Sequence, residues 1–145
     1  MSEPLPADDQ DGYWTRTTSP DGAYVWVVDA GEVKMSHWIM GGQLWRRVPP
    51  AKLLAAPSGW SFEGRTWVST HELKLTGRRY PGRLPGVTLT IDAVAERGVI
   101  ESDDLAAHQQ GGRYLWVKPG EVPAPPPGPQ PLDGLLRWLE AFPAR

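Results

Sequence analysis

The distribution of tryptophan constrains the fold of this chain more than any other feature. Eight Trp occur in 145 residues, and six of them fall in the first half, 7 to 15 residues apart. One strand with its turn occupies about that length, and aromatic residues favour strands. Each Trp also brings a large apolar area that folding must bury. The spacing predicts a small sheet whose strands carry an aromatic core: Trp14, Trp26, Trp38, Trp45, Trp60 and Trp67.

Alternation of polar and apolar residues predicts six to eight antiparallel strands within residues 13–118. The strongest hairpin signal is the SPDG sequence at 19–22, because Pro presets φ and Gly admits a positive φ. We expect an α+β, mainly β fold with an antiparallel sheet or partly closed barrel and one or two short helices. A GG pair at 41–42 and a PP pair at 49–50 punctuate the first four strands. These strands are expected at 13–18, 23–29, 33–39 and 44–48, as a meander.

Farther along the chain, three more strands are predicted, at 66–75, 87–93 and 113–118. A helix is predicted over 102–110, with Ser102 as its N-cap and two acidic residues in its first turn. Residues 51–56 are a short apolar run between prolines and predict a single helical turn.

Composition divides the chain into four parts: a flexible acidic N-terminus (1–12), the β-rich domain (13–118), a polyproline linker (119–131) and a C-terminal helix (132–145). Seven of the thirteen linker residues are Pro, which predicts an extended spacer of about 40 Å. The helix must dock its apolar stripe either on its own domain or on a neighbouring molecule, and the rigid spacer favours the neighbour. The stripe consists of Leu132, Leu135, Leu136, Leu139 and Phe142.

Net charge is −2, but it is unevenly distributed. Residues 1–30 carry −5, residues 31–90 carry +6 and residues 91–145 carry −3. The basic middle segment interleaves Arg with aromatic residues, as partner surfaces and nucleic-acid sites do. The alternative interpretation of the same pattern is a solvent-exposed sheet face that happens to carry Arg. The candidate partner-binding residues are Trp45, Arg46, Arg47, Arg78, Arg79, Tyr80 and Arg83.

Catalytic signals are sparse. The three His are His37, His71 and His108, and they stand 34 and 37 residues apart, with no metal-ligand spacing and no nucleotide-binding or zinc-protease motif. His37 alternates with apolar residues and is expected in the core. The sequence therefore predicts no catalytic residue, no metal site and no cofactor, although distant His and carboxylates can meet in the folded chain.

The absence of Cys rules out disulfides and thiol chemistry. A polar, acidic N-terminus without an apolar run predicts no secretory signal, and no membrane-spanning run is present, so we expect a soluble cytoplasmic protein. We expect a non-catalytic protein-binding module or assembly component that binds a protein partner or a second copy of itself. Its size and composition are compatible with interbacterial immunity proteins and small phage structural proteins, by type only and with no motif in common. The alternatives are a nucleic-acid-binding domain that uses the basic segment, and a small enzyme of unrecognised type.

Overall fold

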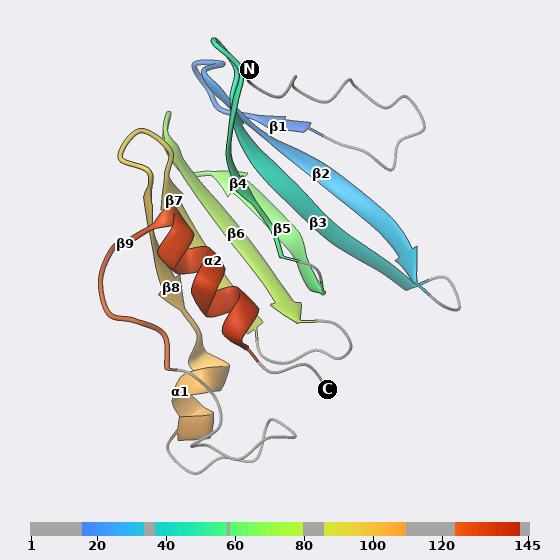
Figure 1. The fold of residues 1–145 in the computed structure, drawn as a ribbon, viewed down its shortest axis with the longest axis vertical. Helices are drawn as coiled ribbons and strands as arrows, with labels where there is room; N and C mark the ends of the chain where they lie inside the picture. Colours follow the sequence, from blue (N-terminus) through green and yellow to red (C-terminus); the bar gives the residue numbers. More distant parts are fainter. Residues whose placement is uncertain (1–15, 34–36, 58, 80–85, 110–123, 143–145) are drawn as a thin grey trace.

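The computed structural model describes residues 16–33, 37–57, 59–79, 86–109 and 124–142, and over 29–33, 37–40 and at Gln109 it describes the backbone alone. The described strands form two antiparallel sheets, which confirms the predicted mainly β class, and they do not close into a barrel (Figure 1). Sheet A contains β1 (Arg16–Thr18), β2 (Tyr24–Val33), β3 (His37–Arg46) and β4 (Ala51–Ala55). Sheet B contains β5 (Trp60–Trp67), β6 (Glu72–Arg79), β7 (Gly86–Asp92), β8 (Arg97–Glu101) and β9 (Gln130–Pro131).

The predicted turn at 19–22 joins β1 to β2. Gly22 has a φ of +76°, which a side chain would disfavour, and its N–H donates to the Ser19 carbonyl at 2.9 Å. The Asp21 carboxylate accepts from the Ser19 hydroxyl at 2.9 Å and from the Ala23 N–H at 3.1 Å. Local sequence chemistry therefore fixes this hairpin.

Sheet A is a four-stranded meander, but two of its strands differ from the sequence prediction. The expected strands at 33–39 and 44–48 are largely one strand, β3, which runs straight through Gly41 and Gly42. Gly42 lies in a strand because of its contact with the neighbouring strand β2. A Cβ on Gly42 would stand 2.5 Å from the ring of Trp26 in β2. Gly42 thus admits a buried indole rather than a turn. The fourth strand is β4, in the run expected to be a helical turn.

In sheet B, one predicted strand differs from the strands in the structure. The run expected at 66–75 contains a turn at 68–71, which separates β5 from β6. The predicted strand at 87–93 matches β7, where Val87, Leu89 and Ile91 are buried and the residues between them are half-buried. The predicted strand at 113–118 lies outside the described residues.

Both helices occur where the sequence places them. Helix α1 (Asp103–Gln109) begins after Ser102, whose hydroxyl accepts from the Leu105 N–H at 3.2 Å as an N-cap does. Helix α2 (Leu132–Ala141) lies across one face of sheet B (Figure 1). No helix in the described ranges is long and apolar enough to cross a membrane.

The main core lies between the two sheets and beneath α2. It joins Trp26 and Leu44 of sheet A to the apolar face of sheet B and to the buried face of α2. Trp60 is its centre, with ring centroids 6.1 Å from Phe62, 6.3 Å from Trp138 and 5.8 Å from Phe142. Its indole N–H donates to the Leu139 carbonyl at 2.9 Å. Trp60 therefore ties the C-terminal helix to the first strand of sheet B.

The predicted docking stripe of α2 faces its own domain. Four of its members are buried and Leu136 packs at the edge of the core, so in this structure the helix packs on its own domain. The described part of the Pro-rich segment, residues 124–131, also contacts the domain. β9 pairs with β8, and the Trp138 N–H donates to the Ala124 carbonyl at 3.1 Å. The buried members are Leu132, Leu135, Leu139 and Phe142.

Candidate functional site

Four turns meet at one end of the two sheets, and we call this surface the turn face: residues 19–23, 47–50, 68–71 and 93–96. Antiparallel hairpins bring these turns together. The Arg47 side chain donates to the Gly22 carbonyl at 3.0 Å, and the Ala93 N–H donates to the His71 carbonyl at 2.8 Å. The two sheets are joined just below, where the Trp67 N–H donates to the Thr17 carbonyl at 2.7 Å.

Exposed apolar side chains gather on the turn face. Among the described residues, the large apolar side chains left exposed are Val48 (84% exposed), Val68 (54%) and Val94 (64%), and each lies in a different turn of this surface. Single exposed apolar residues are ordinary on a protein surface. Three of them at one end of a rigid two-sheet scaffold are a candidate contact surface, since loops on such scaffolds commonly carry function.

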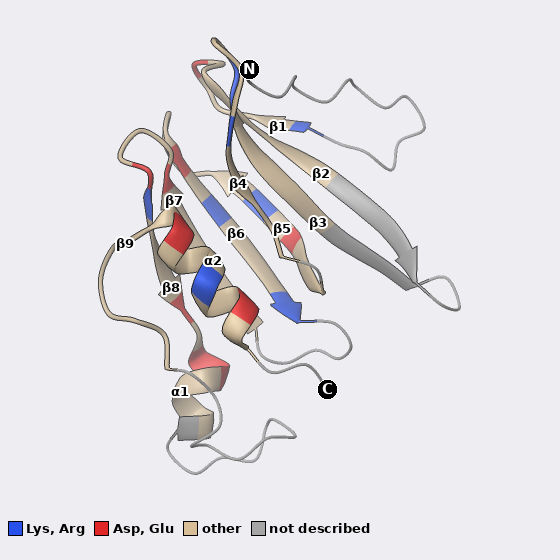
Figure 2. Cartoon of the chain, viewed as in Figure 1, with Lys and Arg blue, Asp and Glu red and all other residues tan. Residues whose placement is uncertain are grey.

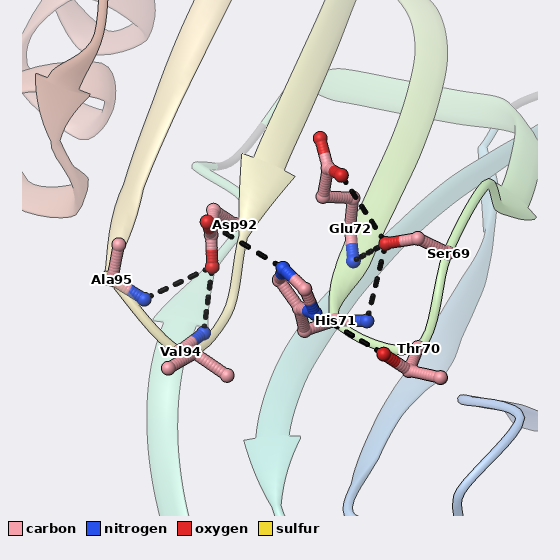
Figure 3. A network of polar contacts seen from close by, with 7 residues as sticks. All are labelled: Ser69, Thr70, His71, Glu72, Asp92, Val94 and Ala95. Carbon is pink, nitrogen blue, oxygen red and sulfur yellow. Dashed lines mark hydrogen bonds and ion pairs between the residues drawn. The ribbon is translucent and has the colours of Figure 1, made fainter.

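A polar network lies in the same place (Figure 3). The Thr70 hydroxyl is 3.1 Å from His71 Nδ1, and His71 Nε2 is 3.9 Å from Asp92 Oδ2. Asp92 also accepts from the backbone N–H groups of Val94 and Ala95, both at 3.0 Å. The hydroxyl of Ser69 accepts from the Glu72 N–H at 3.1 Å in the neighbouring turn.

This network superficially orders a hydroxyl, an imidazole and a carboxylate as a nucleophilic triad does. The geometry serves the turns instead. The 3.9 Å distance from His71 Nε2 to Asp92 Oδ2 is too long for a hydrogen bond. The other carboxylate oxygen of Asp92 accepts hydrogen bonds from backbone N–H groups of its own turn. Two hollows lie on the face of sheet B that carries Thr90, and neither Thr70 nor His71 lines them. The arrangement therefore stabilises two adjacent turns and offers an exposed imidazole.

The other histidines do not join His71. His108 is 1% exposed within α1, and neither of its ring nitrogens has a hydrogen-bond partner among the described residues. The side chain of His37 lies outside the described part of the chain. No group of three or more His, Cys, Asp or Glu among the described residues is arranged to hold a metal ion.

The sequence-predicted partner-binding residues separate into two ends of the molecule. Arg46 and Arg47 are exposed at the turn face, where Arg46 Nε donates to the Pro49 carbonyl at 3.1 Å. Arg78 and Arg79 end β6, and Arg79 pairs with Trp60 at the opposite end of β5 from Trp67 (Figure 2). The guanidinium of Arg78 pairs with the Glu63 carboxylate at 2.9 Å.

The remaining predicted site residues do not reach the surface or are not described. Trp45 is fully buried on the far face of sheet A, in a small cluster with Val25 and Val27, and its indole N–H donates to Gln43 at 2.8 Å. Tyr80 and Arg83 lie outside the described residues. Sequence reasoning missed the exposed valines of the turn face because it placed Val48 and Val68 in strands, at 44–48 and 66–75.

The hydrogen bonds of Asp21 predict how the stability of the hairpin at 19–23 depends on pH. The Ala23 N–H, followed by the Ser19 hydroxyl and the charge of His71, lowers the pKa of the Asp21 carboxyl below its ordinary value of 3.8. A lowered pKa means that the carboxylate stabilises the hairpin fully above about pH 3.8, and that this stabilisation is lost as the pH falls through the lowered value. We expect a carboxyl NMR titration to place the Asp21 pKa below 3.8, and the Ala23 amide to lose protection over the same range.

The matched control for this titration is Asp21→Asn, which keeps the acceptor oxygen but cannot titrate. Its Ala23 amide protection should not change across that pH range. An Asp21 pKa at or above 3.8 in the native chain would contradict the described hydrogen bonds.

Comparison of the chain with protein-family models, curated proteins and solved structures found no match.

Proposed function

We propose that this protein is a non-catalytic protein-binding module whose contact surface is the turn face. The observation that carries the proposal is the placement of Val48, Val68 and Val94, three exposed apolar side chains in three turns at the same end of the two sheets. Each is held by a hairpin of a two-sheet scaffold, so little conformational entropy is lost when a partner covers it.

Charged side chains lie in the same turns and in the neighbouring turn at 19–23. Arg47 donates to the Gly22 carbonyl and remains exposed, and the charge of His71 acts on the carboxylate of the neighbouring Asp21. Arg is enriched among the residues that contribute most to protein interfaces. A protein partner, or a second copy of this chain, fits exposed apolar side chains among groups of both charges better than a nucleic acid does.

Nucleic-acid binding is the second candidate, and the charges favour it less. Arg46 and Arg47 stand at the opposite end of the molecule from Arg78 and Arg79, so these four cations do not form one patch. The Arg78 guanidinium is already paired with Glu63. We expect filter binding of single-stranded DNA to show no retention at low salt, whereas steeply salt-dependent retention would support this candidate.

The test of the proposed function removes apolar area from the turn face. We expect the double variant Val48→Ser/Val94→Ser to lose capture of the partner from extracts of the native host by about tenfold or more, because burying a Val side chain contributes about 1.5 kcal/mol or more. Its melting temperature should stay near that of the native chain, since both side chains are exposed.

Arg137→Ser/Glu140→Ser is the control, because both residues are exposed on α2 and the net charge is unchanged. This variant should capture the same partner as the native chain. Equal capture by the native chain and both double variants would refute the turn face as the contact surface.

A further inference from the structure

A groove crosses the face of sheet B that points away from α2. Two hollows form it, of about 400 and about 260 Å³, and both are lined by Thr90. The larger one reaches from Val68 to the start of α1, and the smaller one reaches Arg97 and Pro129. Because Val68 belongs to the turn face, the groove opens onto that surface and follows β7 away from it.

The floor of the groove has the period of an extended polypeptide. Thr88 and Thr90 alternate with the buried residues of β7, so their side chains lie on the same face of the sheet. Residues two apart on a strand repeat every ~6.7 Å, which is also the side-chain repeat of an extended chain lying beside it. Each hydroxyl can donate and accept a hydrogen bond, as backbone amides require.

The charge of the groove selects against anions. The larger hollow carries the carboxylates of Glu101, Asp103 and Asp104 and the ammonium of Lys74, a net charge of −2. The smaller hollow carries Glu72 and Asp92 with Arg97, a net charge of −1. Figure 2 shows the acidic residues at the end of β8 and the start of α1.

Two of these carboxylates are available to a ligand. Asp104 accepts from the Gly86 N–H at 2.6 Å, and Glu72 accepts from the Ser69 hydroxyl at 3.2 Å. The side-chain carboxylates of Glu101 and Asp103 make no hydrogen bond or ion pair with any residue that the structure describes. A cation bound between them would therefore break no existing contact.

We infer that the groove holds an extended basic segment of the partner polypeptide, with Lys or Arg side chains directed at Glu101 and Asp103. The inference rests on the proposed function and adds the chemistry of the partner. The five residues of β8, Arg97–Glu101, span about 17 Å and set the length of the bound segment at about five residues. The apolar part of the same partner then covers the valines of the turn face.

A fluorescent nine-residue peptide of alternating Lys and Ser tests the inference with the full chain. We expect it to bind, and we expect Glu101→Gln/Asp103→Asn to weaken binding about fivefold, which is typical of losing two partly exposed ion pairs. Glu101→Gln alone should weaken it by a smaller factor, and it leaves the first turn of α1 intact. The counterpart peptide of alternating Glu and Ser should not bind.

Asp133→Asn/Glu140→Gln is the matched control, because it removes the same charge from the exposed side of α2. It should bind the basic peptide as the native chain does. Absence of peptide binding, equal weakening in both double variants, or equal binding of spermidine would each overturn the inference. The partner-capture assay at Val48 and Val94 uses neither peptide nor groove variant, so the proposed function can fail or hold independently.

Discussion

A chain truncated after Gly120 is expected to lose its cooperative thermal unfolding transition. Truncation removes a helix whose buried side chains form one wall of the core beside Trp60. Burial of each large apolar side chain contributes about 1.5–3 kcal/mol, and whole domains are stable by only about 5–15 kcal/mol. Circular dichroism during heating measures the outcome. The lost side chains are Leu132, Leu135, Trp138, Leu139 and Phe142.

Point variants show whether the helix acts through its buried face. Leu135 is fully buried, so Leu135→Ala should destabilise the chain by about 2–5 kcal/mol. Arg137 is exposed, and its ion pair with Asp133 at 3.5 Å is a surface pair, so Arg137→Ala should change stability by less than about 0.5 kcal/mol. If the truncated chain keeps the melting temperature of the full chain, the docking of α2 on its own domain is wrong.

Substitution Gly42→Ala is expected to destabilise the protein by about 1–3 kcal/mol through overpacking. The new Cβ would lie 2.5 Å from Cζ2 and 2.6 Å from Cε2 of the Trp26 ring. Trp26 is fully buried and packs edge-on against Phe62 at 6.3 Å, so it has little room to move. Urea denaturation measures the free energy of unfolding.

Gly134→Ala is the control for this prediction. Gly134 lies in α2, and a Cβ there would meet its nearest neighbours at 3.5 Å, an ordinary contact distance. Ala favours a helix over Gly by about 1 kcal/mol, so this variant should be neutral or stabilising. The opposite order of the two variants would contradict the strand through Gly41 and Gly42.

Local chemistry made several elements predictable from sequence. The turn at 19–22, the Ser102 cap, the alternation of β7 and the apolar stripe of α2 each depend on residues close together in the chain. Gly42 shows where such reasoning fails. Gly permits a turn and also a close approach of a neighbouring side chain, and only the position of Trp26 across the sheet decides between them.

Only part of the candidate surface could be predicted from the sequence. Arg46 and Arg47 were identified from composition, and they lie on the turn face. Arg78 and Arg79 lie at the other end because β6 runs away from this surface, which depends on strand register. The groove of sheet B brings together β6, β7, β8 and α1, and no spacing along the chain reveals that grouping.

Site-specific photo-cross-linking tests the role of the turn face most directly. A photoreactive benzophenone side chain replaces Val48 in one chain, Val94 in a second and Arg137 in a third, and each is irradiated in cells of the native host. We expect positions 48 and 94 to cross-link to the same protein, or to a second copy of this chain, and position 137 on the exposed side of α2 not to do so. Cross-linking of that partner from position 137 alone, or no cross-link from positions 48 and 94, would contradict this expectation.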